Sequence, residues 1–399
     1  AFDLHWGPTE RSCQNHPFSG ATPPQLLALL GRHWRHVEWA RYAHRVLFLA
    51  ALSALNGLLA AVEWALHARA VARTELHPRP VFVLGQPRTG TTHVHNLLAR
   101  DTETFHHAAT FDVGFPSSFL WTRSWLPRLL AGMLSERRPM DNMELGWDLP
   151  QEDELATQLL SGGASPYVAI ALLRREAWAP LLPLWTLDAA RGCPAAERER
   201  WKRAFLWFCK KLQYRAGPGR RLLLKSPVHT ARIKTILEIF PDAQFVCVHR
   251  NPYEVYASSI NMAQKYYGYS ALCRPSSEDV LQYVLEQFEL MHEAYITDAA
   301  RLLGRPARSG GAFAGDRLVE VPFAELDARP LEAVRRIYDG LGLAPAGSPE
   351  RLEVEAAVAT YLSQLQGFKK NAFAPLHPAA RAMVRRRWRC AFEDFGYDA

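Results

Sequence analysis

The stretch Gly85-Gln86-Pro87-Arg88-Thr89-Gly90-Thr91-Thr92 decides the interpretation of this 399-residue sequence. It follows the continuous apolar run Val81–Leu84, which predicts a short buried strand closed by a glycine. A helix is predicted next, from Thr91 to Arg100. A strand, a glycine turn and a helix in this order predict a phosphate-binding α/β unit, because backbone N–H groups and the helix N-terminus surround an anion.

The loop lacks the lysine of a Walker motif. Gly85 and Gly90 have the Walker spacing, but Thr91 stands where that lysine belongs. An enzyme that uses a nucleoside triphosphate normally places that lysine and a magnesium ion against the β- and γ-phosphates. The cation here is Arg88, whose planar guanidinium matches an oxygen pair of phosphate or sulfate. The loop therefore favours a phosphate or sulfate ligand over ATP; a strand–helix turn without a ligand is the alternative.

The rest of the chain predicts the α/β class. Three further strands are expected, each followed by a helix: Leu222–Leu224, Gln244–His249 and Leu318–Val321. This alternation predicts three layers, with a central, mainly parallel sheet and helices on both faces. We expect a helical extension over residues 1–78, including a long helical stretch from about Gln25 to Val71, and an α/β domain over 79–399 with a helical insertion at about 115–214.

A second motif makes the interpretation specific. The run Pro87–Thr92 resembles the loop that binds the 5′-phosphosulfate in sulfotransferases that use 3′-phosphoadenosine 5′-phosphosulfate (PAPS). Arg250 follows a predicted strand, and Ser258 comes eight residues later, which resembles the family's 3′-phosphate site. Lys369 and Lys370 fall where the family has a basic loop over the nucleotide. The broad group that includes tyrosylprotein and bacterial or algal small-molecule sulfotransferases is the most similar.

The resemblance implies PAPS as donor, without a metal. Its nucleotide site would consist of Pro87, Arg88, Thr89, Gly90, Thr91, Thr92, Arg250, Ser258, Lys369 and Lys370. In-line sulfuryl transfer places negative charge on the leaving oxygen, so fixed cations are the main catalytic need. Arg88 is the first candidate for that role. Lys225, after the second predicted strand, is the next, because it matches a lysine near the transferred group in relatives.

The acceptor hydroxyl needs a general base, and several residues remain candidates. Cytosolic sulfotransferases use a histidine two residues past the strand lysine, but that position here is Pro227. Other members use a carboxylate after the helix that follows the loop, and Asp112 lies about there, although glutamate is more usual. The alternatives are His229, and Glu152 or Glu154 in the acidic run that precedes a predicted helix.

Composition limits the partners. The net charge of +7, from 47 Lys and Arg against 40 Asp and Glu, suits anionic ligands, but no nucleic-acid-binding motif accompanies it. The six cysteines lack zinc spacing, so a metal site is not expected. The aromatic segments Phe115–Leu134 and Trp178–Trp185 favour a hydrophobic small molecule or lipid as acceptor. A helical cap in place of a binding wall, and a sugar as acceptor, are the alternatives.

The apolar run Val46–Leu66 raises the question of membrane contact. Its length suits a spanning helix, but Asn56 and Glu63 are costly in lipid, so a membrane-surface or partner-facing helix and an ordinary buried helix stay open. A homodimer is also left open. Because no secretory signal is recognised in the given chain, we expect a cytoplasmic or membrane-associated protein. A kinase-like phosphoryl transferase and a non-catalytic nucleotide-binding scaffold are the alternative functions.

Overall fold

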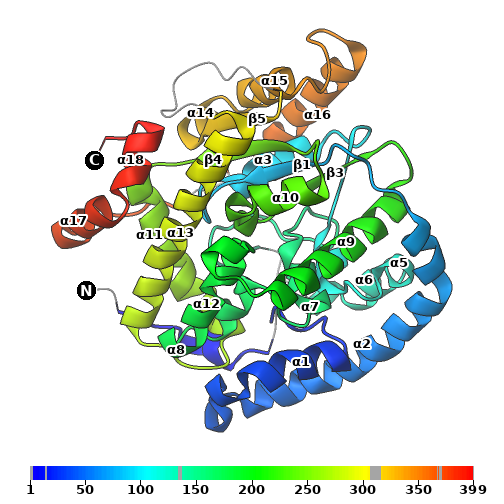
Figure 1. Ribbon diagram of the computed structural model, residues 1–399, viewed down its shortest axis with the longest axis vertical. Helices are drawn as coiled ribbons and strands as arrows, with labels where there is room; N and C mark the ends of the chain where they lie inside the picture. The colour runs from blue at the N-terminus through cyan, green and yellow to red at the C-terminus, as the bar shows by residue number, and fades with distance from the viewer. Residues whose placement is uncertain are drawn as a thin grey trace. The chain divides into compact units, whose positions relative to one another are not determined.

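The computed structural model describes residues 3–13, 16–133, 137–305, 316–365, 367 and 371–398 (Figure 1). Its sheet has five strands: β1 (Val81–Leu84), β2 (Phe105–His107), β3 (Arg221–Lys225), β4 (Gln244–His249) and β5 (Leu318–Pro322). The strands are all parallel and lie in the order β2-β3-β1-β4-β5. This architecture confirms the predicted α/β class and four of its strands. The edge strand β2 was not predicted, because its two histidines interrupt any apolar run.

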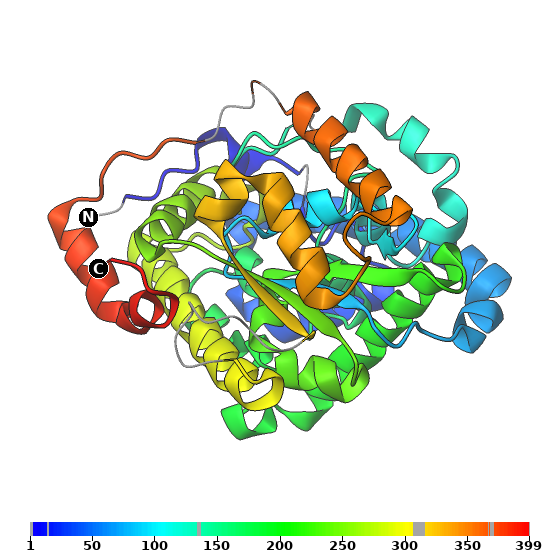
Figure 2. The same ribbon diagram turned by 90° about the horizontal axis from the view of Figure 1, so that it is seen from above.

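Helices cover both faces of the sheet (Figure 2). Val81 and Val83 point to one face, where they join the core formed with α3 (Thr91–Leu98) and α15 (Pro330–Leu341). Phe82 points to the other face, where its ring lies 6.3 Å from that of Phe240, the residue that ends α10 (Ile233–Ile239). Because both faces are covered, these strands are continuous apolar runs, which explains why the sequence predicted them.

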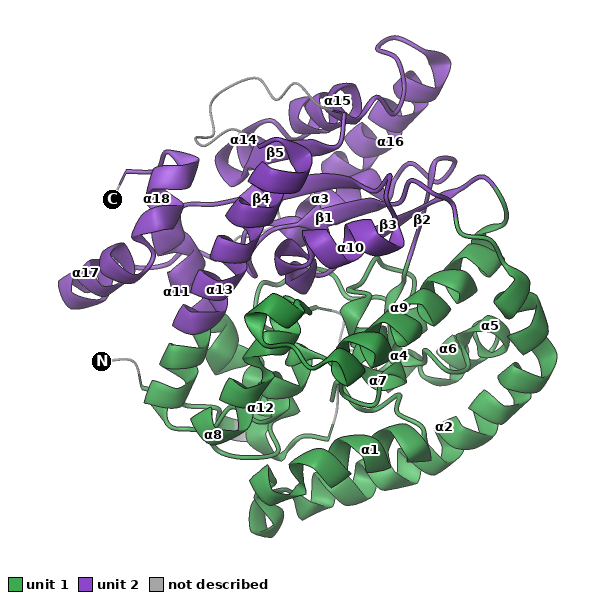
Figure 3. Cartoon of the chain, in the orientation of Figure 1, with its two compact units in different colours: residues 1–76, 108–218, 260–284 green, residues 77–107, 219–259, 285–399 purple. Residues whose placement is uncertain are grey.

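The chain divides into two compact units (Figure 3). Unit 1 holds residues 1–76, 108–218 and 260–284, and unit 2 holds 77–107, 219–259 and 285–399. The N-terminal helices thus belong to the same unit as the predicted insertion at about 115–214. The division at residues 78 and 79 stays a prediction.

Unit 2 contains the sheet, and its further helices are α14 (Phe323–Ala328), α16 (Pro349–Gln364), α17 (Pro378–Arg387) and α18 (Arg389–Phe395). Unit 1 is helical, with α1 (Pro23–His33), α2 (Trp39–Arg73), α4 (Thr110–Gly114), α5 (Phe119–Thr122), α6 (Leu126–Leu129), α7 (Glu154–Leu160), α8 (Arg175–Trp178), α9 (Ala195–Ala216) and α12 (Tyr267–Ser270). Two helices have residues in both units: α11 (Pro252–Lys265) and α13 (Ser277–Leu303).

The helical stretch predicted from about Gln25 to Val71 consists of two helices, α1 and α2, with a 3-10 turn at Trp34–His36 between them. A contact of Glu38 accounts for the break. Its backbone N–H donates to the carbonyl oxygen of Leu272, in the segment between α12 and α13, at 2.9 Å, and not to a carbonyl oxygen of its own helix. Helix propensity alone does not reveal a long-range contact of this kind.

Candidate functional site

The loop between β1 and α3 has a backbone that its residue types make possible. Gly85 has φ +146°, and a Cβ there would lie 2.5 Å from the carbonyl oxygen of Val248, so only glycine fits. Gly90 has φ +100° and precedes the first turn of α3. Arg88 has φ +73°, a left-handed conformation that costs a residue with a side chain about 1–2 kcal/mol. Strain of this kind at a loop cation is typical of a functional site.

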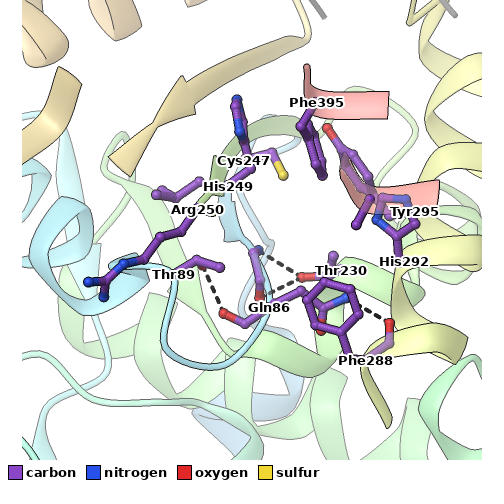
Figure 4. Close-up of a pocket in the computed structure, with 13 residues that line it drawn as sticks. Gln86, Thr89, Thr230, Cys247, His249, Arg250, Phe288, His292, Tyr295 and Phe395 are labelled. Atoms are coloured by element: carbon purple, nitrogen blue, oxygen red, sulfur yellow. Dashed lines mark hydrogen bonds between the residues drawn. The ribbon is translucent and has the colours of Figure 1, made fainter. Parts of the chain in front are cut away.

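Hydrogen bonds fix the loop to its surroundings (Figure 4). Inside the loop, Thr89 Oγ1 donates to the carbonyl oxygen of Gln86 at 2.8 Å. The Gly85 N–H donates to Thr230 Oγ1 at 2.8 Å, and that hydroxyl lies 3.0 Å from the Gly85 carbonyl oxygen. Gln86 Nε2 donates to the carbonyl oxygen of Phe288 in α13 at 3.0 Å. The loop is thus held in shape before any ligand arrives, which is the preorganisation that anion binding requires.

Three residues that the sequence predicted to bind PAPS lie together at the loop. Arg88 Nε donates to Ser258 Oγ, in α11, at 3.1 Å. Arg250, which directly follows β4, donates from Nη1 to the backbone carbonyl oxygen of Arg88 at 3.4 Å. Glu254 pairs with Arg250 at 2.6 Å, and the Arg250 guanidinium lies 4.2 Å from the ring centre of Phe323. Residues far apart in the sequence therefore form one cationic cluster with a hydroxyl in it.

Lys225 reaches the loop from the neighbouring strand. It ends β3, which pairs with β1 in a register that sets Lys225 opposite Val83. Its side chain is buried, and Nζ donates to Thr92 Oγ1 at 3.4 Å. The carboxyl ends of parallel strands meet at one edge of the sheet, so the ends of β3, β1 and β4 bring Lys225, the loop and Arg250 to the same edge.

A pocket adjoins the loop and contains about 350 Å³ of empty space, part of it open to solvent (Figure 4). Its lining includes Thr89, Phe288 and Phe395. The ring of His249 stacks on that of Phe395 with 4.3 Å between their centres. Burial lowers the pKa of His249 to about 3, with a smaller contribution from Arg305, so this imidazole is neutral at physiological pH. Aromatic rings, including this neutral imidazole, therefore form part of the pocket wall.

Asp112, the first candidate for the base, lies in unit 1 and is wholly buried. Arg215 donates two hydrogen bonds to its carboxylate, at 2.5 and 2.8 Å, and Arg123 donates one at 2.6 Å. The Ala109 N–H adds another at 2.8 Å. Burial raises the pKa of Asp112, but the two guanidinium groups outweigh burial and hold its pKa below the ordinary value. These contacts make Asp112 a poor proton acceptor, so its role as base stays a prediction that the geometry disfavours.

The other three candidates differ in exposure. Glu154 is buried, and its two oxygens accept hydrogen bonds from Ser165 Oγ at 2.6 Å and Trp201 Nε1 at 2.9 Å. His229 is also buried, and its ring makes an edge contact with Phe82, with 5.4 Å between ring centres. Glu152 is half-buried and accepts a hydrogen bond from the Tyr167 hydroxyl at 2.6 Å. Of the four candidates, Glu152 is the one with solvent exposure.

The basic loop of the predicted site is not located. Lys369 and Lys370 lie outside the described residues. Within the described ranges, no group of three or more His, Cys, Asp or Glu side chains is arranged to hold a metal ion. The absence of a metal requirement stays a prediction.

Sequence reasoning missed the residues that support the site. Thr230 and Gln86 anchor the loop, and Arg123 and Arg215 neutralise Asp112. Thr230 could have been found from the sequence, because it lies in the turn after β3, and β3 pairs with β1, the strand before the loop. Arg215 could not, because it lies 103 residues from Asp112 at the end of a helix.

The chain is similar to known proteins over most of its length. The profile of the sulfotransferase family matches residues 80–346. The chain is 31% identical over 377 residues to the omega-hydroxy-beta-dihydromenaquinone-9 sulfotransferase Stf3 of Mycobacterium bovis and of Mycobacterium tuberculosis, covering 93% of this chain and 89% of the relative.

Two solved structures share the fold at 18% sequence identity. Sulfotransferase STF1 from Mycobacterium tuberculosis superposes with a TM-score of 0.61 and covers 92% of this chain and 91% of its own. Sulfotransferase STF9 from Mycobacterium avium superposes with a TM-score of 0.60 and covers 89% and 86%. On the profile match and the identity to Stf3, the chain belongs to the sulfotransferase family and is an enzyme of that family.

Proposed function

We propose that the chain transfers the sulfuryl group of PAPS to a hydroxyl of an apolar, lipid-like acceptor. One observation carries the choice of donor: Arg88, Ser258 and Arg250 meet beside a loop that is itself built for an anion. PAPS carries a 3′-phosphate in addition to its 5′-phosphosulfate, and it therefore needs two anion sites close together. ATP has no 3′-phosphate and would leave the second site without a ligand.

The residues divide the work as follows. The loop amides, Thr91 and Thr92 hold the 5′-phosphosulfate, while Arg250 and Ser258 hold the 3′-phosphate. The acceptor oxygen forms a bond to sulfur as the bond between sulfur and the 5′-phosphate oxygen breaks. Negative charge then grows on that phosphate oxygen, and Arg88 and Lys225 stabilise it in a site where both cations are already in place.

We propose Glu152 as the base that takes the proton of the acceptor hydroxyl. A base must be within hydrogen-bond reach of a bound hydroxyl, so it needs an accessible lone pair. Glu152 is half-buried, whereas Asp112 and Glu154 are buried and His229 has a fully covered ring. The Tyr167 hydroxyl at 2.6 Å would orient the carboxylate.

The acceptor class is proposed from the relative. Stf3, at 31% identity over nearly the whole chain, is named for an omega-hydroxylated dihydromenaquinone. A hydroxyl at the end of a long apolar molecule is therefore the acceptor we propose here. The sequence had suggested Trp178–Trp185 as a binding wall, but Trp178 and Trp185 are buried in unit 1, so they build core. Phe115 and Trp147, which are in contact and half-buried, are better candidates for an apolar wall.

Calorimetric titration tests the donor assignment. We expect 3′,5′-adenosine bisphosphate to bind without magnesium at least about tenfold more tightly than adenosine 5′-phosphate, because a hydrogen bond to a charged group contributes about 1.5–3 kcal/mol. Arg250→Ala should remove that difference, and Arg329→Ala, an exposed arginine paired with Glu332, is the matched control. Equal affinity of the two nucleotides for the wild-type protein would refute the second phosphate site.

A further inference from the structure

Helix α2 exposes an apolar face to solvent and buries four polar side chains. By length and composition it could cross a membrane, yet it is packed along unit 1 beside α1 (Figure 3). Its buried face carries the polar residues Arg45, Ser53, Asn56 and Glu63 together with Tyr42, Val46, Leu49 and Val71. Its outer face carries large exposed apolar side chains: Leu47, Leu55, Leu58, Val62, Trp64 and Leu66. A helix of a soluble domain shows the opposite arrangement, so the outer face needs an explanation.

The polar face is anchored to unit 1. Asn56 Nδ2 donates to the carbonyl oxygen of Ser19 at 2.7 Å, and Arg45 donates to that of Gly268 at 2.9 Å. Glu63 forms an ion pair with Lys211 and accepts the Leu120 N–H at 2.6 Å. Crossing a bilayer would strip these groups of their partners and place Arg45 and Glu63 in lipid, which is costly. The helix therefore stays with its unit and offers one face.

The outer face is long and uncharged. Leu47 is 71% exposed and Leu58 70%, and residues 47, 51, 54, 58, 62 and 65 fall on one side of a helix. At 1.5 Å per residue the stripe from Leu47 to Leu66 is about 28 Å long. Between Val46 and Ala68 the sequence has one charged residue other than histidine, Glu63, and it is on the buried face.

Basic residues flank the stripe. Arg41 and His44 are exposed before it, where Arg41 pairs with Glu10 at 3.2 Å and Glu38 at 3.6 Å, and Arg69 and Arg73 are exposed after it. Glu63 is the single acidic residue of α2, so the exposed charge on this helix is positive throughout. A second copy of the chain paired in parallel would bring Arg69 and Arg73 against the same two arginines of its partner. An anionic lipid surface, in contrast, complements both the apolar stripe and the basic residues Arg69 and Arg73 that follow it.

We propose that the outer face of α2 docks unit 1 on the surface of a membrane that contains anionic lipids, with the helix lying in the interface. The leucines enter the boundary between headgroups and acyl chains, and the terminal arginines contact the headgroups. Docking follows from the helix itself. Docking would give the enzyme access to an acceptor dissolved in the bilayer, and this consequence rests on the proposed function.

Vesicle co-sedimentation without donor or acceptor tests the docking. Wild-type protein should bind vesicles of equal parts phosphatidylcholine and phosphatidylglycerol. The triple variant Leu47→Gln, Leu58→Gln, Leu66→Gln should lose at least about a hundredfold in partition coefficient, because three buried leucines are lost from the contact. Leu129→Gln and Leu352→Gln remove leucines that are 74% and 56% exposed on other helices, and both should bind like the wild type.

Charge is tested separately with Arg69→Gln, Arg73→Gln. This double variant should bind mixed vesicles about tenfold more weakly, and it should match the wild type on phosphatidylcholine alone. Thermal unfolding of each variant checks the fold, and Leu58→Gln alone replaces the triple variant if that variant does not fold.

Three outcomes would overturn the docking. The triple variant could bind vesicles as well as the wild type. A wild-type dimer that the triple variant converts to monomer in lipid-free solution would assign the face to a second copy. Resistance of the bound wild type to alkaline carbonate would assign α2 to the bilayer interior. Sulfation of a short water-soluble alcohol separates a failure of the docking from a failure of the proposed function. If the wild type is not a sulfotransferase, it will not sulfate that alcohol. If only the docking is lost, sulfation of the alcohol will be unchanged.

Discussion

Arg88→Ala is expected to lower kcat/KM for sulfotransfer by about a thousandfold, the size of effect seen when a fixed cation or donor at a developing negative charge is removed. Arg88 lies inside the phosphate loop and bonds Ser258, so its guanidinium is in place before the donor binds. Steady-state rates with PAPS measure the effect. Lysine at this position should recover part of the rate, because it restores the charge without the planar fork.

Folding must be separated from catalysis in this experiment. Arg88 has φ +73°, which glycine adopts without strain, so Arg88→Gly should be at least as stable as the wild type in thermal unfolding. It should be as inactive as Arg88→Ala, and Arg329→Ala should be fully active. Normal turnover by a folded Arg88→Gly enzyme would refute the assignment of the loop.

Glu152→Gln is expected to lower kcat by about 10²–10⁴-fold, the usual contribution of a general base. The amide keeps the size of the side chain and its contact with the Tyr167 hydroxyl but cannot accept the proton. Affinity for 3′,5′-adenosine bisphosphate should not change, since Glu152 has no part in the donor site. Single-turnover rates with PAPS and calorimetry with the bisphosphate measure the two effects independently.

Asp112→Asn is the contrasting variant. It leaves Arg123 and Arg215 without a buried counter-charge, so we expect the free energy of unfolding to fall by about 2–4 kcal/mol, allowing for the partial exposure of both arginines. The folded pKa of Asp112 is lowered, so its contribution to stability is present above the ordinary carboxyl pKa and is lost as the pH falls through the folded pKa. The stability difference between wild type and variant should therefore shrink below about pH 4.

The two variants identify the base between them. Folded Asp112→Asn protein should keep its rate within about tenfold of the wild type, because this role is structural. If Asp112→Asn were stable but inactive while Glu152→Gln turned over normally, the base would be Asp112.

Local motifs predicted which residues would lie together around the loop. The strand run Val81–Leu84, the glycines of the loop and the spacing of Arg250 and Ser258 are short-range features, and the structure places Arg88, Arg250 and Ser258 together. The surroundings of Asp112 were not predictable, because Arg215 reaches it from 103 residues away. The position of Asp112 after the loop suggested that it is the base, whereas its ion pairs with Arg123 and Arg215 indicate a structural role.

Helix α2 shows a different limit of sequence reasoning. Its apolar run was evident from the sequence, but the usual pattern of a surface helix predicts that polar residues face the solvent. Here Arg45, Asn56 and Glu63 turn inward because Gly268, Ser19 and Lys211 offer them partners from distant segments. The sequence thus supplied the composition of the helix, and tertiary contacts decided which face is exposed.

Detection of the transferred group tests the central claim most directly. Wild-type protein is incubated with a hydroxylated apolar acceptor and either PAPS with a magnesium chelator or ATP with magnesium, and the products are identified by mass spectrometry. The account predicts a sulfate ester of the acceptor from PAPS without magnesium, and no phosphate ester from ATP. A phosphate ester formed from ATP and magnesium, with no sulfate ester from PAPS, would contradict it.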